Sequence, residues 1–199
     1  MSLMTRGLEP AVAAVCVVPL VLLAYKAYSG DLGVNPIETL THETGGTALK
    51  LLVASLAVTP VRRLTGWNRL VSTRRLLGIF AFFYAVLHFS IYLVFDQFFD
   101  VMAIVDDVLK RKFILSGMVA FLAMLPLALT STNGWIRRLG RRWQTLHRLA
   151  YLAGAAAAIH FVWKTKVPEV EPYAYAGVVA VLLLTRVWFS WKKRQTQTA

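Results

Sequence analysis

The chain has 199 residues, of which 57% are hydrophobic, and it carries a formal net charge of +12. A soluble domain is about 45–50% apolar, whereas here long apolar runs alternate with short charged clusters, which excludes a soluble core with a tail and predicts a polytopic helical membrane protein. Most basic residues lie between the apolar runs, so membrane topology explains the charge and we expect no nucleic-acid partner.

The first predicted span covers residues 10–28. Its apolar stretch from Ala11 to Tyr28 is longer than the roughly 7–15-residue core of a signal peptide, and no clear cleavage site follows, so we expect a retained helix. The chain's one cysteine, Cys16, lies within this run and has neither an intrachain disulfide partner nor metal-ligand spacing.

Further apolar runs approach the about 20 residues that cross a bilayer. They cover residues 45–61, 76–95, 112–130, 146–163 and 173–191. The predicted fold class is therefore an all-α integral membrane protein, a bundle of six transmembrane helices. The longest loops, 29–44 and 96–111, are too short to form a domain, and the chain contains no nucleotide-binding motif. Electrons for any redox reaction would have to come from a partner or a membrane-soluble carrier.

Basic residues mark one side of this predicted bundle. They cluster after the second, fourth and sixth spans, at Arg62, Arg63, Arg69, Arg74 and Arg75, at Arg137, Arg138, Arg141 and Arg142, and at Lys192, Lys193 and Arg194. All acidic residues except Glu9 fall in the opposite loops. Because cytoplasmic loops carry the excess of Lys and Arg, both termini are predicted to be cytoplasmic.

Two histidines lie inside the predicted spans at a similar depth. His88 is in the span 76–95 and His160 in the span 146–163, and both spans run from the inner to the outer side. Ionisable residues within a membrane are costly and are usually functional. Two imidazoles at matched depth on facing helices can bind one haem iron from both sides. The alternative is a pair of hydrogen-bonded histidines between helices.

A third histidine, His147, lies at the cytoplasmic end of the fifth span, thirteen residues or about 20 Å from His160. It could bind a second haem or be an interfacial histidine. No second histidine opposes it, and the nearest equivalent position on the third span is Arg74, which could pair with a haem propionate. His42, in contrast, is predicted to be a solvated residue of a loop or a helix start.

Motifs along nearly the whole chain point to a known family. They are Leu32-Gly33-Val34-Asn35-Pro36-Ile37-Glu38, Thr44-Gly45, Thr59-Pro60, Arg74-Arg75-Leu76-Leu77-Gly78, Phe83-Tyr84-Ala85-Val86-Leu87-His88-Phe89, Leu146-His147-Arg148-Leu149-Ala150-Tyr151 and His160-Phe161-Val162-Trp163. In these motifs and their order the chain resembles the MsrQ family, formerly YedZ, of the ferric-reductase-like transmembrane group.

The resemblance implies one haem-binding domain over residues 1–199, in the bacterial inner membrane. It implies a membrane subunit without a substrate-reducing site of its own. Electrons would come from the quinone pool or a cytoplasmic flavin reductase and go to a periplasmic molybdopterin enzyme that reduces methionine sulfoxide in oxidised proteins.

The resemblance also implies cofactors and their ligands. Haem b would be bound by His88, His147 and His160, and flavin mononucleotide (FMN) is associated with the family. The wider group has two pairs of haem histidines, but here Arg74 or Arg75 takes the fourth position, which leaves one haem or two as alternatives.

Two other functions are compatible with the sequence. The chain could be the cytochrome b anchor of a different periplasmic oxidoreductase, which would need the same haem site. It could instead be a haem-free transporter or channel, but such proteins use broken helices or intramembrane acids, and the acids here lie in predicted loops.

Overall fold

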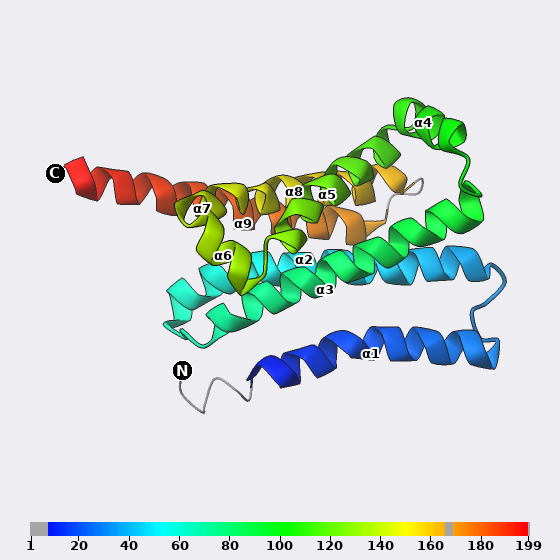
Figure 1. The fold of residues 1–199 in the computed structure, drawn as a ribbon, viewed down its shortest axis with the longest axis horizontal. Coiled ribbons are helices and arrows are strands. Elements are labelled where there is room, and N and C mark those ends of the chain that lie inside the picture. The colour runs from blue at the N-terminus through cyan, green and yellow to red at the C-terminus, as the bar shows by residue number, and fades with distance from the viewer. Residues whose placement is uncertain (1–7, 166–168, 199) are drawn as a thin grey trace.

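The structure is a computed structural model that describes residues 8–165 and 169–198, and within these ranges it is helical with short connections (Figure 1). The helices are α1 (Leu8–Ser29), α2 (Pro36–Thr65), α3 (Leu70–Ile91), α4 (Val101–Lys110), α5 (Lys112–Leu129), α6 (Asn133–Leu139), α7 (Arg141–Leu146), α8 (Leu149–Lys164) and α9 (Val170–Thr198). A π-helical turn, Tyr92–Asp96, continues α3.

Two antiparallel helix pairs form the centre of the bundle. Helix α2 packs chiefly on α3, and α5 packs chiefly on α8. Small and apolar side chains make this close packing possible, and the central buried cluster consists of Leu52, Ala81, Ala123, Met124 and Ala153. Helix α9 covers α8, while α1 lies at the edge of the bundle against α3 and α2.

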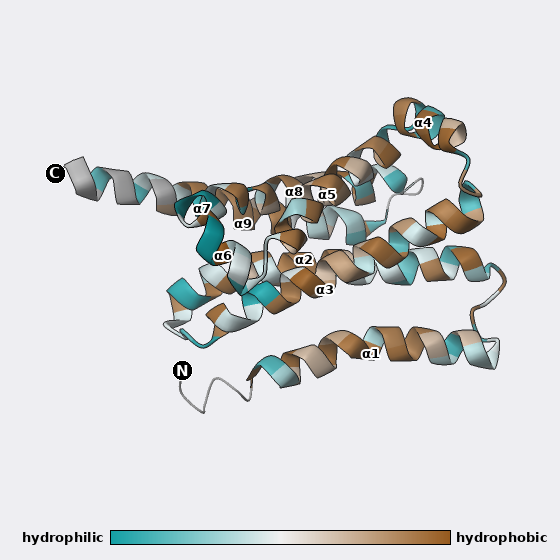
Figure 2. Cartoon of the chain, in the orientation of Figure 1, coloured by the Kyte–Doolittle hydropathy of each residue, from teal (hydrophilic) through white to brown (hydrophobic). Residues whose placement is uncertain are grey.

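The chain is a multi-pass membrane protein. Among the described residues, α1, α2, α3 with its π-helical turn, α5 and α9 are long and apolar enough to span a bilayer. Figure 2 shows apolar residues along these helices and hydrophilic residues at α6 and α7. Helix α8 corresponds to the predicted span 146–163 but has 16 residues, about 24 Å at 1.5 Å per residue, so the sixth span stays a prediction.

Helix α2 begins well before the predicted start at residue 45, so His42 lies in a helix. Of the two predicted alternatives for His42, a loop or a helix start, the loop is wrong. The Asn35 side chain caps the helix by accepting a hydrogen bond from the backbone N–H of Glu38 at 3.3 Å, and Pro36 occupies the first helical position. Hydropathy missed this start because the first two turns are polar. His42 is therefore in the second turn of a membrane-spanning helix.

The predicted loop 96–111 also contains a helix, α4. Asp100 caps it by accepting hydrogen bonds from the backbone N–H groups of Met102 at 2.9 Å and Ala103 at 3.0 Å. Before α4, Phe98 and Phe99 adopt positive φ angles of 47° and 60°, a conformation that is strained for bulky residues. This segment is thus a structured cap at one end of the bundle.

The arginine-rich segments gather at the opposite end of the bundle from α4. The turn between α2 and α3, the short helices α6 and α7, and the C-terminal part of α9 all lie at this end, together with the start of α1 (Figure 1). The arrangement places the three basic clusters predicted from the sequence on one side.

Candidate functional site

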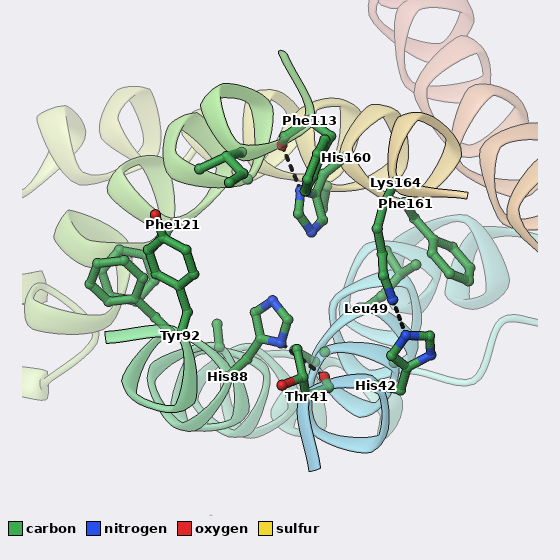
Figure 3. A pocket seen from close by; sticks show the side chains of 18 of the residues that line it. Thr41, His42, Leu49, His88, Tyr92, Phe113, Phe121, His160, Phe161 and Lys164 are labelled. Atoms are coloured by element: carbon green, nitrogen blue, oxygen red, sulfur yellow. Dashed lines mark hydrogen bonds between the residues drawn. The ribbon is translucent and has the colours of Figure 1, made fainter. Parts of the chain in front are cut away.

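His88 of α3 and His160 of α8 face each other inside the bundle. Their ring centroids are 6.1 Å apart and the ring planes are inclined at 80°. Nδ1 of His88 is 2.9 Å from the backbone oxygen of Thr41 on α2, and Nδ1 of His160 is 2.7 Å from that of Phe113 on α5. Figure 3 shows that the other ring nitrogens point toward one another across an open space.

These hydrogen bonds determine which nitrogen of each imidazole is available to a ligand. A carbonyl oxygen can only accept, so Nδ1 of each ring carries the hydrogen and donates it. In a neutral imidazole Nε2 then presents its lone pair, which is the arrangement of a metal-binding histidine whose other nitrogen is held by the protein. Both lone pairs are directed into the same space.

A glycine on the facing helix makes room for each imidazole. A Cβ atom on Gly45 would lie 2.9 Å from Nδ1 of His88, and one on Gly117 would lie 2.7 Å from Nδ1 of His160. The two histidine sites repeat the same pattern. Each glycine lies one helical turn after the residue whose carbonyl accepts the hydrogen bond, and each histidine is 47 residues beyond that acceptor. The α2–α3 and α5–α8 pairs therefore build equivalent halves of one site.

A cavity of about 1150 Å³ surrounds the two imidazoles. This volume slightly exceeds the usual range for small-molecule and cofactor sites, about 300–1,000 Å³. Small residues of four helices keep it open, namely Gly45, Ala85, Gly117, Ala120 and Ala157. The cavity extends to the α4 end of the bundle, where polar residues such as Gln97 and Asp107 line it.

The two imidazoles have the spacing that haem requires. An imidazole nitrogen binds a first-row metal at about 2.0 Å and lies about 1 Å from its ring centre, so two imidazoles on one iron would have centroids about 6 Å apart. Among the described residues, no group of three or more His, Cys, Asp or Glu could bind a free metal ion. Haem brings four nitrogen ligands of its own, so two histidines are sufficient for it. The residues present therefore fit a haem.

Aromatic side chains form one wall of the cavity. Phe121 packs against Phe89 at 4.8 Å in a tilted arrangement and stacks with Phe82 at 5.6 Å between ring centroids, and Phe89 stacks with Tyr92 at 6.1 Å. Phe83 and Trp163, by contrast, are exposed on the outside of the bundle.

The alanine-rich run of α8, residues 153–158, serves mainly helix packing. Ala153, Gly154, Ala156 and Ala158 are buried between helices, and a Cβ on Gly154 would lie 2.8 Å from Leu56. Ala157 is the member of this run that lines the cavity. Most positions of this run therefore serve close helix packing, and one lies against the cavity.

His147 lies at the other end of the bundle, in the turn between α7 and α8. Its ring stacks on Trp143 at 3.8 Å between centroids, and its Nε2 is 3.3 Å from Oγ1 of Thr130. The cavity that it lines has a volume of about 80 Å³, room for a few water molecules at about 30 Å³ each. This space does not fit a second haem.

Arg74 and Arg75 line the same small cavity as His147 rather than the large one. The backbone oxygen of Arg74 accepts a hydrogen bond from Ser55, and the guanidinium of Arg75 donates one to Asn133 of α6 at 2.6 Å. Arg74 lies fourteen residues before His88, about 21 Å along the helix. The structure thus does not bring the two arginines into the site of His88 and His160.

Sequence reasoning missed several residues of the large cavity. His42 and Lys164, on α2 and α8, contact each other at its edge, and Lys50 lines it further along α2. The sequence did contain a signal for Gly45 and Gly117, because each precedes its histidine by the same number of residues. That regularity becomes meaningful only once the helix pairs are known.

The chain was compared with known families and proteins. The family described as "Ferric reductase like transmembrane component" matches residues 44–158, which include His88 and His147 and end just before His160. The comparison with solved structures found no match.

Several similar proteins are named "Protein-methionine-sulfoxide reductase heme-binding subunit MsrQ". The one from Herminiimonas arsenicoxydans is 49% identical over 180 residues, which cover 89% of this chain and 83% of the relative. That from Ralstonia nicotianae is 46% identical over 94% of this chain and 88% of the relative. That from Rhodospirillum rubrum is 44% identical over 95% of this chain and 91% of the relative.

Proposed function

The chain belongs to the MsrQ family of the ferric reductase-like transmembrane group, and on that premise we propose that it is a b-type cytochrome subunit that carries electrons across the membrane. The observation that supports this function best is the geometry of His88 and His160, whose ring nitrogens face one another within a cofactor-sized cavity. The relatives' names describe a haem-binding subunit, which agrees with the donor set of this cavity.

The protein's part in this function is to hold and orient the haem. Haem bound there would supply a one-electron couple between ferric and ferrous iron. The carbonyls of Thr41 and Phe113 fix the orientation of the two imidazoles and make them better donors. His88 and His160 would both hold the iron from opposite sides of the cavity, an arrangement suited to electron transfer.

We infer a topology of six spans with both termini in the cytoplasm of a bacterial cell, in the inner membrane. Helix α8 would be the sixth span. It is shorter than the others but packs between α5 and α9. The arginine-rich end would be cytoplasmic. The end with α4, toward which the large cavity extends, would face the periplasm.

The physiological partners follow from the family and this orientation. Electrons would come from the quinone pool or a cytoplasmic flavin reductase, and FMN stays a predicted cofactor. They would leave on the periplasmic side to a molybdopterin methionine sulfoxide reductase that repairs oxidised proteins. The acidic residues around the mouth of the cavity, Asp96 and Glu171 among them, would meet this soluble partner.

The test is the haem content of the purified full-length protein and of two variants, His88→Ala and His160→Ala. A pyridine haemochrome assay on the wild-type protein should give haem b, and each variant should lose most of it, because each removes one axial ligand. Circular dichroism and gel filtration in detergent check that the variants are inserted and folded. Full retention of haem in both folded variants would refute the site.

A further inference from the structure

The space between the two imidazoles has two edges of different chemistry. Figure 3 shows Phe121 and Tyr92 on one side of the His88–His160 pair and Lys164 with His42 on the other. A flat macrocycle between the rings would therefore have an aromatic neighbour at one edge and a cationic neighbour at the other. Haem itself is asymmetric in this sense, because its two propionates lie on one edge.

Lys164 reaches this edge from the last turn of α8. It follows His160 by four residues, so the two side chains lie on the same face of the helix. Its ammonium group contacts Nε2 of His42, which is 3.9 Å from a carboxylate oxygen of Glu38. Among the described residues, no carboxylate lies within 4.0 Å of the Lys164 ammonium. A half-buried cation thus stands at the cavity without an acidic partner in direct contact.

The other cations of the cavity are placed differently. Arg111 is paired with Asp107, with 3.0 Å between Nε and Oδ1. Lys50 is exposed and lies eight residues beyond His42 on α2, about 12 Å further from the α4 end. Gly45, which faces His88, marks the depth of the imidazoles along the bundle. Lys164 lies between this depth and the α4 end, whereas Lys50 lies on the other side of the imidazoles, away from the α4 end.

We propose that Lys164 binds a propionate of the haem and so fixes the orientation in which the haem sits, with its propionates toward the α4 end. The proposal rests on the haem site of His88 and His160 proposed above. A carboxylate is costly to bury without a partner, and a lysine ammonium beside it gives a charge-assisted hydrogen bond. The aromatic edge offers no such partner, so the apolar edge of the macrocycle lies there.

The experiment compares the haem-loaded full-length protein with Lys164→Met, Lys164→Arg and the matched control Lys50→Met. The first readout is the haem midpoint potential. Removing the ammonium leaves the propionate charge uncompensated, which favours ferric iron, so Lys164→Met should have a lower potential. Lys164→Arg keeps the charge and should stay near the wild type, as should Lys50→Met.

The second readout is the rate at which haem passes from the protein to apomyoglobin. Loss of one hydrogen bond to a charged group should make this transfer about tenfold faster in Lys164→Met. With haem dimethyl ester, whose propionates are blocked, the wild type and Lys164→Met should release the macrocycle at the same rate. As in a double-mutant cycle, this comparison isolates the interaction between the Lys164 ammonium and the propionate. Lys164→Gln replaces Lys164→Met if the latter fails to insert.

Two results would overturn the proposal. Lys164→Met could match the wild type in both potential and transfer rate, or Lys50→Met could show the larger effects, which would mean that the propionates point the other way. Both results are distinct from failure of the haem site itself, which would show as haem retained in His88→Ala and His160→Ala.

Discussion

Gly117 and His160 are in such close contact that no side chain fits between them. A Cβ atom on Gly117 would lie 2.7 Å from Nδ1 and 3.0 Å from Cε1 of His160, which is closer than nonbonded carbon and nitrogen atoms pack. The imidazole cannot easily move away from Gly117, because its Nδ1 donates a hydrogen bond to the backbone oxygen of Phe113 at 2.7 Å. The absence of a side chain at Gly117 therefore allows His160 to hold the position in which it can bind a ligand.

We expect Gly117→Ala and Gly45→Ala each to reduce the haem-to-protein ratio severalfold, because the new methyl group displaces the imidazole from its carbonyl acceptor. Absorption spectra of the purified variants measure the effect. Gly177→Ala on α9 is the control, since nothing lies within 4 Å of a Cβ at that position and it does not line the large cavity, and it should keep the wild-type haem content. Equal haem in all three variants would show that the contact does not position the ligands.

His147→Ala should keep the haem of His88 and His160. His147 lines the separate small cavity, and its main contacts are the stacking on Trp143 and the hydrogen bond with Thr130. We expect a loss of stability of about 1 kcal/mol from these contacts, seen as a lower thermal midpoint in detergent. Loss of all haem from a folded His147→Ala protein would mean that the histidines are paired differently.

A reporter that is active only in the cytoplasm should work when it is fused after Ala199. This outcome requires α8 to cross the membrane despite its 16 residues, because a chain with the five longer helices alone would end on the opposite side from its start. A paired fusion of a periplasm-only reporter at the same position should be inactive. The reverse pattern would leave a topology of five spans.

Neutralising exposed acids at the periplasmic end should slow electron delivery to the soluble reductase. Asp96→Asn combined with Glu169→Gln and Glu171→Gln removes three negative charges from exposed positions. Because electrostatic steering is screened by salt, the rate should fall severalfold at low ionic strength and approach the wild-type rate at high ionic strength. Stopped-flow oxidation of the reduced haem by the reductase measures this, and an unchanged rate at low salt would exclude docking through these acids.

Asp107 should not be part of that set, although it lies in the same segment. Its carboxylate accepts hydrogen bonds from Tyr92 at 3.2 Å and Gln97 at 2.7 Å and pairs with Arg111. Its replacement would disturb the cap of the bundle, so a change in rate would not report on docking.

Tyr84→Phe should loosen α1 without affecting the haem. The Tyr84 hydroxyl donates to the backbone oxygen of Cys16 at 2.7 Å and accepts from the N–H of Leu20 at 3.0 Å, so it bridges α1 and α3. We expect a loss of about 1 kcal/mol, measured as a lower thermal midpoint. Tyr25→Phe, at an exposed position of α1, is the control and should have no effect. A Tyr84→Phe midpoint equal to that of Tyr25→Phe would contradict the role of the bridge.

Depth within the membrane could be predicted from the sequence because a helix rises by a constant amount per residue. Counting from the span starts placed His88 and His160 at similar depth and His147 about 20 Å away, and the structure brings the first two together and leaves the third apart. The basic clusters likewise fall at one end of the bundle. These features depend only on the position of residues along helices.

The helix starts of α2 and α4 could not be read from hydropathy, because they depend on capping by Asn35 and Asp100 and not on apolar side chains. For this reason the sequence left His42 in a loop or at a helix start, although it lies in the second turn of α2. The contact between His42 and Lys164 joins residues 122 positions apart, so it cannot be predicted from a local sequence pattern.

A helical membrane protein with two histidines at matched depth could be predicted from the amino-acid sequence, because apolar length and helical rise are local properties. The folded bundle was needed to show which nitrogen of each imidazole faces the cavity, which glycine makes room for it, and which lysine lies at the cavity's edge. These depend on the rotation of each helix about its axis and on the side chains that its neighbours present, and both result from packing between helices rather than from any one of them.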